Sequence, residues 1–262
     1  MLTISAELIE DLQTGNLNRQ DLYRFDLHGI ALAQAQLHRA SLIGVNFSNS
    51  HLSSTDFSEA DLRGVDFSQA HLIDSNFTAA CLYRVNLSGA NLSGANLTDA
   101  KLQGARYDGA TIWPKGFVYK STGAIGPGAN LNGASLNTAS LRSIDLSGAT
   151  LLGAYLGGTD LTGANLQRAR LSQADLRKAY LTGATLRGAG LNGANVAGAD
   201  FRAADFTDVE FDALEDIAGA DFYQVQGLSD KCRSYLLSQP AEVLDTWNSF
   251  TRRTTGESLQ FY

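Results

Sequence analysis

The chain has 262 residues, of which 44% are hydrophobic, so it holds enough apolar material for a core and is not a disordered polypeptide. A formal net charge of −7 disfavours binding to a phosphate backbone, and we expect no direct nucleic-acid partner. No apolar run approaches the roughly 18 residues that a membrane helix needs, and the first residues do not read as a secretory signal. We therefore expect a cytoplasmic protein that does not enter a membrane.

The first 15 residues carry the signals of a short helix. Ser5 is a suitable N-cap, Ile4 and Ile9 are spaced as a hydrophobic staple, and Gly15 suits the position after a helix end. We predict an N-terminal helical cap over residues 1–15 that covers the first turn of the structure that follows.

Residues 16–112 repeat a five-residue pattern. Apolar residues, here called centres, recur at every fifth position without a break from Leu17 to Ile112, and a small residue, most often Ala, stands two positions before most of them. A period of five fits neither a helix nor a plain strand, but residues two apart point to the same side of an extended chain. Gly often stands two positions after the centre, where it can supply a corner. Each unit is thus predicted to be a very short strand followed by a corner.

Side-chain size within this first block sorts with a period of 20. Phe47 and Phe67 are 20 residues apart, and so are Phe57 and Phe77. This sorting is expected if residues i and i+20 stack on each other, which requires four units in each turn of a coil. The pattern predicts an all-β, four-sided solenoid whose successive turns lie about 4.8 Å apart. The second block shows no such sorting, so the inference rests on the first.

Residues 113–128 interrupt the pattern, and we expect a distorted coil or a loop there. Leu131, where the centres resume, follows Ile112 by 19 residues, one short of a full turn. Since Phe117 still falls on the old phase and Gly126 on the new one, the slip is placed between them, at about residues 118–125.

The interruption holds the candidate partner-binding residues, which are Trp113, Phe117 and Tyr119. One interpretation is that these aromatic side chains pack locally to plug the defect. The other is that they form an exposed landing site for a protein partner, because large aromatic residues dominate the energetics of interfaces.

The second block of repeats covers residues 129–224, with centres from Leu131 to Phe211 and an Ala-Asp-Phe triplet that returns one residue late at 220–222. Its predicted register is that of the first block, with one extra residue after Phe211.

Residues 225–262 are predicted to form a C-terminal helical cap. Ser229 is placed to cap a helix that runs to about Ser238, and Pro240 suits the first turn of a second helix. The second helix would carry an apolar stripe of Val243, Leu244, Trp247 and Phe250. A dimer interface is the alternative role for these stripes.

The chain carries few signals of catalysis, and we predict that it is not an enzyme and has no catalytic, cofactor-binding or metal-binding residues. It lacks the phosphate-binding, zinc-protease and serine-hydrolase motifs. His51 and His71 would lie one above the other and could share a metal, but no acid or Cys occupies their column, so a solvated polar stack is expected. Cys81 has a Lys neighbour in its column that could activate a thiol, although a surface Cys in a repeat is usually inert.

The units, such as Asn-Leu-Ser-Gly-Ala at residues 86–90 and again at 91–95, are similar to A(D/N)LXX repeats, and the chain resembles the pentapeptide-repeat protein family over roughly residues 15–211. The resemblance implies a right-handed quadrilateral β-helix, here of about nine coils. Some members resemble a DNA duplex in size and negative charge, bind DNA gyrase, confer fluoroquinolone resistance and act as dimers joined through their C-terminal ends.

We accordingly expect a non-enzymatic scaffold without cofactors that binds a so far unidentified protein partner through its solenoid surface. The chain would act as a monomer or as a C-terminally joined homodimer. The alternative is a DNA-mimic regulator of a DNA-binding enzyme such as DNA gyrase.

Overall fold

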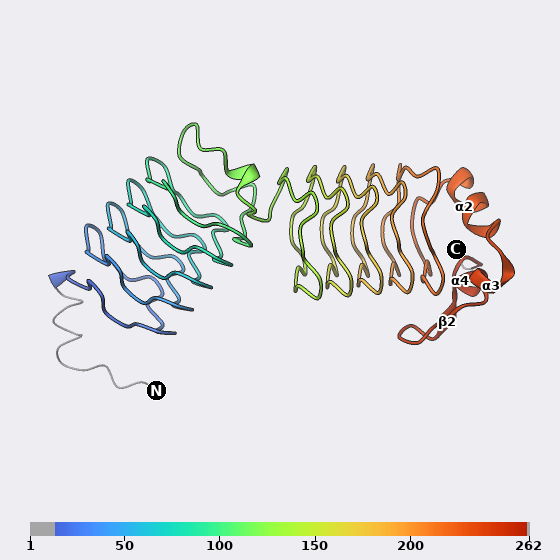
Figure 1. Cartoon of the computed structure of the whole chain (residues 1–262), viewed down its shortest axis with the longest axis horizontal. Coiled ribbons are helices and arrows are strands. Elements are labelled where there is room, and N and C mark those ends of the chain that lie inside the picture. The colour runs from blue at the N-terminus through green and yellow to red at the C-terminus, as the bar shows by residue number, and fades with distance from the viewer. Residues whose placement is uncertain (1–13, 261–262) are drawn as a thin grey trace. The chain divides into compact units, whose positions relative to one another are not determined.

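The computed structural model describes residues 14–260, which form stacked coils followed by a group of small C-terminal elements (Figure 1). The chain divides into two compact units, Met1–Ile125 and Gly126–Tyr262. The predicted N-terminal helical cap lies outside the described residues, apart from Thr14 and Gly15.

Each strand of the first unit is a single bridging residue, and the bridges define a four-sided coil. Parallel bridges join residues 20 apart, from Asn16 with Gln36 to Asn86 with Arg106, and there is one bridge for every five residues. A tight turn follows each bridge, as where the N–H of Gln20 donates to the carbonyl of Leu17 at 3.2 Å. The predicted period of four units per coil is therefore confirmed.

The second unit uses the same register, although its sequence does not sort into columns. Bridges join residues 20 apart from Asn130 with Thr150 to Gly190 with Glu210. One extra residue then enters, and the later bridges join residues 21 apart, as in Asp200 with Asp221. The late return of the Ala-Asp-Phe triplet has this insertion as its cause.

The centres fill the interior of both units, and the Phe centres stack as their spacing predicts. The rings of Phe47 and Phe67 are 5.6 Å apart with 6° between their planes, and those of Phe57 and Phe77 are 5.1 Å apart with 7°. All four side chains are fully buried. Offset-stacked pairs of this kind contribute about 0.5–1.5 kcal/mol beyond the burial of their surface.

Hydroxyl side chains replace Ala at several inward-facing positions because each finds a carbonyl in the preceding coil. Ser50 Oγ donates to the carbonyl of Leu27 at 3.0 Å, and Thr55 Oγ1 donates to that of Leu32 at 2.9 Å. A buried hydroxyl without such a partner would destabilise the core. The inward slot before a centre thus accepts Ala, Ser or Thr without a change of fold.

The second residue after each centre turns the corner in the left-handed region of φ. Gly44 has a φ of 68°, but Ala79 and Ala203 occupy the same slot with a φ of 57° each. Left-handed backbone costs an ordinary residue about 1–2 kcal/mol, because its Cβ approaches the following carbonyl oxygen.

Replacing these alanines with glycine is expected to stabilise the protein. Ala79→Gly and Ala203→Gly remove the strain at exposed positions and should each raise the free energy of unfolding by about 0.5–1 kcal/mol, after the greater freedom of Gly in the unfolded chain is deducted. Thermal unfolding measures the effect. Ala33→Gly is the matched control, since Ala33 is exposed but not left-handed, and it should lower the stability.

The interruption contains two irregularities of opposite sign. The bridge of Asn91 with Ile112 spans 21 residues, and the bridge of Arg106 with Ile125 spans 19. The extra residue lies in the turn at Asp108, whose Oδ1 accepts the N–H groups of Ala110 and Thr111 at 3.0 Å each.

The slip therefore begins before residue 112, and the prediction that placed it at about 118–125 is wrong. Tyr107 is the last buried centre of the first unit, while Ile112 occupies an outward bridging slot and is 50% exposed. The aliphatic side chain of Ile112 continued the apolar pattern in the sequence although it had left the interior.

The C-terminal region begins as predicted and then departs from the prediction. The helix α2, Asp230–Leu237, is capped by Ser229, whose Oγ accepts the N–H of Cys232 at 3.2 Å. The second predicted helix stops after one turn, and Trp247 and Phe250 lie outside it. The elements besides α2 are η1 at Tyr119–Ser121, α3 at Ala241–Leu244, β1 at Trp247–Asn248, β2 at Arg253–Thr254 and α4 at Thr255–Ser258.

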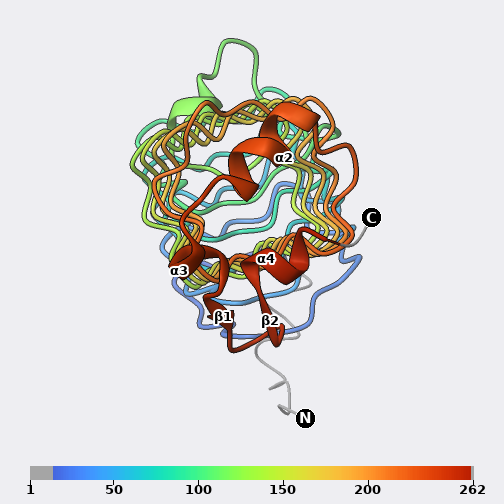
Figure 2. The same ribbon diagram turned by 90° about the vertical axis from the view of Figure 1, so that its right-hand side faces the viewer.

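Asn248 is the physical reason why the second helix does not continue. Its Oδ1 accepts the N–H groups of Phe250 and Thr251 at 2.9 and 3.0 Å, which starts a turn instead of a further helical turn. The strands β1 and β2 then pair as an antiparallel hairpin. In Figures 1 and 2 the helices lie at the end of the second unit, with the hairpin beside them.

Candidate functional site

The structure brings the three sequence-predicted residues of the interruption together. The rings of Trp113 and Tyr119 are stacked at 4.9 Å, and Phe117 lies 5.7 Å from Trp113. Tyr107 meets the rings of Trp113 and Tyr119 edge-on at 5.6 and 5.3 Å. All three predicted side chains are half-buried, so they pack as a plug on the last buried centre of the first unit.

The surface that this plug presents is small and partly basic. Val118 is 71% exposed, and Lys115 and Lys120 are exposed beside it. Lys120 Nζ lies 6.0 Å from the centre of the Tyr119 ring. In Figures 1 and 2 the green segment of the interruption projects beyond the coils of its own unit.

A larger open aromatic surface lies where the C-terminal hairpin meets the coils of the second unit. Trp247 and Phe250 are 56% and 60% exposed, and the Phe250 ring meets that of Tyr180 edge-on at 5.0 Å. These residues line a groove of about 500 Å³, which we call the hairpin groove. Small coil residues leave room for the groove, namely Ala197, Gly198, Ala218 and Gly219.

Buried polar contacts hold the hairpin against the coils. Asn248 Nδ2 donates to the carbonyl of Gly219 at 2.7 Å. Arg253 stacks over the Tyr223 ring at 3.9 Å, and its Nη1 lies 3.6 Å from Oδ2 of the fully buried Asp221. The groove is therefore preorganised, because its mobile-looking hairpin is fixed to the coil by a charge pair and by side-chain hydrogen bonds.

The charges around the hairpin groove are mostly paired within the coil. Arg177 binds Asp175 at 2.7 Å, and Arg202 binds Asp200 at 2.7 Å. Lys178 lines the groove, is exposed and has no ion pair among the described residues. The groove thus combines an aromatic wall with one available cation.

Asp200 is the buried member of this set, and its pKa is shifted by two opposing causes. Burial raises the pKa of Asp200, but the hydrogen bonds from the Arg202 side chain and backbone and from Thr182 Oγ1 outweigh burial and hold the pKa below its ordinary value. A carboxyl whose pKa is lower in the folded state stabilises that state above its unfolded-state pKa of about 3.9.

The stability of the second unit is therefore expected to fall in acid. The contribution of Asp200 is fully present at neutral pH and is lost as the pH falls below about 4 and through the lowered folded-state pKa. Thermal unfolding from pH 7 to pH 2 measures the loss. Asp200→Asn should be less stable at pH 7, since Arg202 loses its partner, and should show a shallower decline in acid than the wild type.

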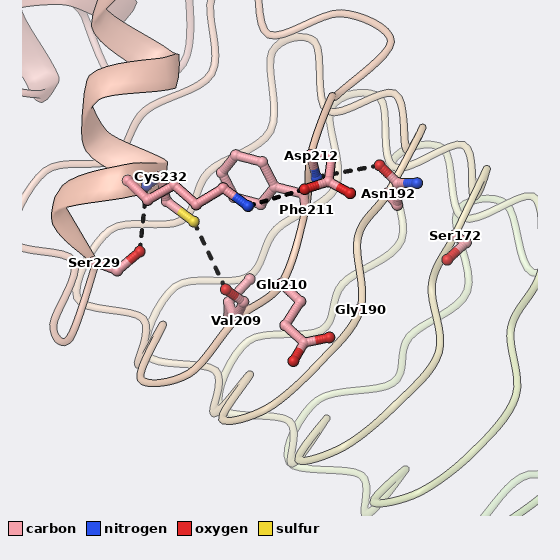
Figure 3. A pocket seen from close by; sticks show the side chains of 10 residues that line it. Ser172, Gly190, Asn192, Val209, Glu210, Phe211, Asp212, Ser229 and Cys232 are labelled. Atoms are coloured by element: carbon pink, nitrogen blue, oxygen red, sulfur yellow. Dashed lines mark hydrogen bonds and ion pairs between the residues drawn. The ribbon is translucent and has the colours of Figure 1, made fainter.

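A second groove of about 500 Å³ lies between α2 and the last coil (Figure 3). Lys231 Nζ binds Asp212 Oδ1 at 2.9 Å, and Asn192 Oδ1 accepts the N–H of Asp212 at 3.2 Å. Cys232 is buried, with its Sγ 3.7 Å from the carbonyl of Val209. These polar groups satisfy one another and fix α2 to the coil, so the α2 groove is explained as packing.

Neither groove presents the geometry of a catalytic centre. In the described part of the chain no three His, Cys, Asp or Glu side chains converge on a point where a metal could bind. Within residues 14–260 no helix has the length and apolar character needed to cross a membrane.

Sequence reasoning missed the hairpin groove because it read Trp247 and Phe250 as the buried stripe of a helix. The available signals were Asn248, which favours a turn, and Thr254 with Glu257, which form a capping box at the start of α4. Together they mark a break in the helical pattern between residues 245 and 254.

The comparisons with known proteins agree with the coil geometry. The family model described as pentapeptide repeats matches residues 30–106 and 127–212 in eight copies. HetL, a pentapeptide repeat protein involved in heterocyst differentiation regulation from the cyanobacterium Nostoc sp. strain PCC 7120, is 28% identical over 86% of this chain and 94% of its own, with a TM-score of 0.37. No curated protein matches the chain.

Two further solved structures are similar to the chain. A pentapeptide repeat protein from the Arabidopsis thaliana thylakoid lumen is 31% identical over 51% of this chain and 88% of its own, with a TM-score of 0.46. QnrB1, a plasmid-mediated fluoroquinolone resistance protein, is 26% identical over 81% of this chain and 97% of its own, with a TM-score of 0.30. The family fold is a right-handed quadrilateral β-helix, and its members are generally non-catalytic scaffolds. The repeats over residues 30–106 and 127–212 show that the chain belongs to the pentapeptide-repeat family.

Proposed function

We propose that the protein is a non-enzymatic interaction module that binds a protein partner through the hairpin groove. The observation that supports this function best is the pair of exposed aromatic side chains, Trp247 and Phe250, on a fixed groove wall. Large exposed aromatic residues in a preorganised groove are typical of binding hot spots, because little ordering is needed on association. The protein would act in the cytoplasm, as a monomer or as a homodimer joined at its C-terminal end.

The chemistry of the groove defines the partner segment. Trp247 and Phe250 suit an apolar or aromatic side chain, and the small residues on the coil side leave depth for it. Lys178 at the rim suits a carboxylate close to that side chain, since its ammonium has no acidic partner among the described residues. The partner is thus a protein segment that combines one large apolar residue with a nearby acid.

The interruption is a second proposed contact for the same or another partner. Trp113, Phe117 and Tyr119 form a rigid base, and Val118 is the apolar residue exposed at this segment. The exposed Lys115 and Lys120 would favour a partner with acidic groups here as well.

Mimicry of DNA toward an enzyme such as DNA gyrase is the alternative function, and the described surface gives it less support. A DNA mimic needs rows of unpaired negative charge, whereas acids on the first unit alternate with Asn or pair with Arg. Asn46 Nδ2 donates to Asp26 Oδ1 at 2.9 Å, and Arg63 binds Asp61 at 2.7 Å. Inhibition of gyrase supercoiling by a stoichiometric amount of the protein would favour this alternative.

A peptide library tests the proposed function without knowledge of the host partner. Random peptides displayed on phage are selected on the wild-type protein after depletion on a Trp247→Ala/Phe250→Ala variant. The enriched peptides should carry an apolar residue near an acid, bind the wild type, and lose affinity for Lys178→Ala. Peptides that bind the double variant as tightly as the wild type would contradict the assignment to the hairpin groove. Trp113→Ala/Phe117→Ala is the matched control and should leave the binding unchanged.

A further inference from the structure

Two exposed histidines lie side by side on the first unit. His51 and His71 occupy the outward slots of successive coils, and a parallel bridge joins them. The centres of their rings are 4.8 Å apart, with 63° between the ring planes. The N–H of Leu52 donates to the carbonyl of His71 at 2.8 Å, so the backbone holds the pair in a fixed register. We infer that this pair binds a divalent transition-metal ion such as Zn²⁺, Ni²⁺ or Cu²⁺.

The other two histidines differ from this pair because serines engage them. His28 Nδ1 lies 2.9 Å from Ser48 Oγ, and His38 Nδ1 lies 2.9 Å from Ser58 Oγ. The imidazole nitrogens of the pair have no hydrogen-bond partner among the described residues and face solvent. They are therefore available as ligands without the loss of an existing contact.

The spacing of the two rings suits a chelate. Imidazole nitrogens bind Zn²⁺ at about 2.0–2.1 Å, so two adjacent ligands on one ion lie about 3 Å apart. Rings with centres 4.8 Å apart reach that separation through small side-chain rotations. Two neutral imidazoles are borderline ligands that favour Cu²⁺ over Zn²⁺ and Ni²⁺, and all of these over Mg²⁺ or Ca²⁺.

The rest of the column shows that the pair supplies both protein ligands. Ala31 precedes the pair and has no donor atom, and Asn91 follows it with its Oδ1 already accepting Ser93 Oγ at 2.7 Å. Water would complete the coordination, which leaves positions open to a ligand from another molecule. A bound ion joins two successive coils, so it should also raise the thermal stability of the first unit.

Calorimetric titration of the full chain with Zn²⁺ and Ni²⁺ tests the inference. A Cys81→Ser background removes the partly exposed free thiol, which would otherwise compete for the metal. We expect one site per chain, and His51→Ala or His71→Ala should each weaken its affinity by more than about tenfold, because even the loss of an outer-shell partner costs about 10–100-fold. His28→Ala and His38→Ala are the matched controls and should leave the affinity unchanged.

A second measurement separates a metal effect from a folding effect. The melting temperature of the His51→Ala variant without metal should equal that of the wild type, since the side chain is exposed, and Ni²⁺ should raise only the wild-type value. Wild-type affinity no greater than that of a His51→Ala/His71→Ala variant would overturn the inference. An equal loss in the His28 and His38 variants would also overturn it.

Discussion

Leu62→Asp is expected to unfold the first unit at room temperature. Leu62 is fully buried, and its column continues through Leu42 and Leu82 in the adjacent coils, so the new carboxylate would face only hydrocarbon. Leu→Ala in a core costs about 2–5 kcal/mol, and an unpaired buried charge adds a large desolvation penalty to that loss. A compact unit has a total stability of about 5–15 kcal/mol, so this one substitution removes most of it.

Circular dichroism and thermal unfolding measure this result. The variant should lose the part of the unfolding signal that belongs to the first unit. Ala33→Asp is the matched control, because Ala33 is exposed immediately after the centre Leu32 and should tolerate the charge. A soluble Leu62→Asp protein that melts like the wild type would show that Leu62 does not face the interior.

Phe67→Ala is expected to lower the stability of the first unit by about 3–5 kcal/mol. Phe67 stacks on Phe47 at 5.6 Å and meets Phe57 and Phe77 edge-on at 5.7 and 6.0 Å. Its truncation leaves a cavity that the hydrogen-bonded coils above and below cannot close. Phe67→Leu should cost much less, because Leu already occupies most centres of the coil.

Denaturant unfolding followed by circular dichroism measures the loss, and Phe250→Ala serves as the matched control. Phe250 is exposed on the hairpin, so its truncation should weaken the binding of a selected peptide while leaving the melting temperature close to that of the wild type. Equal destabilisation by the two Phe→Ala substitutions would contradict the division between core and surface aromatic residues.

The coil was predictable from the sequence because its register is written in side-chain size. Phe centres 20 residues apart stack only if four units close one turn, and the structure has the rings of Phe57 and Phe77 parallel at 5.1 Å. The corner slot was predictable from Gly44 but not from Ala79, since nothing in a repeat of polar and small residues marks a left-handed alanine. The period thus determined the architecture but not the strain in it.

The irregular segments could not be predicted in the same way, because tertiary contacts decide them. Ile112 fits the apolar period, yet the turn at Asp108 inserts one residue and moves Ile112 to the surface. Trp247 and Phe250 fit a helical stripe, yet Asn248 binds the coil and turns the chain into a hairpin. Apolar spacing alone does not distinguish a buried stripe from an exposed aromatic wall.

The accessibility of the two tryptophans tests the central claim, that the hairpin groove and not the interruption presents the open aromatic surface. Trp113→Phe leaves Trp247 as the single tryptophan, and Trp247→Phe leaves Trp113. Acrylamide should quench the red-shifted emission of Trp247 strongly, while the emission of Trp113, stacked on Tyr119 and packed on Tyr107, should be protected. A protected Trp247 together with a readily quenched Trp113 would contradict the claim and would move the binding surface to the interruption.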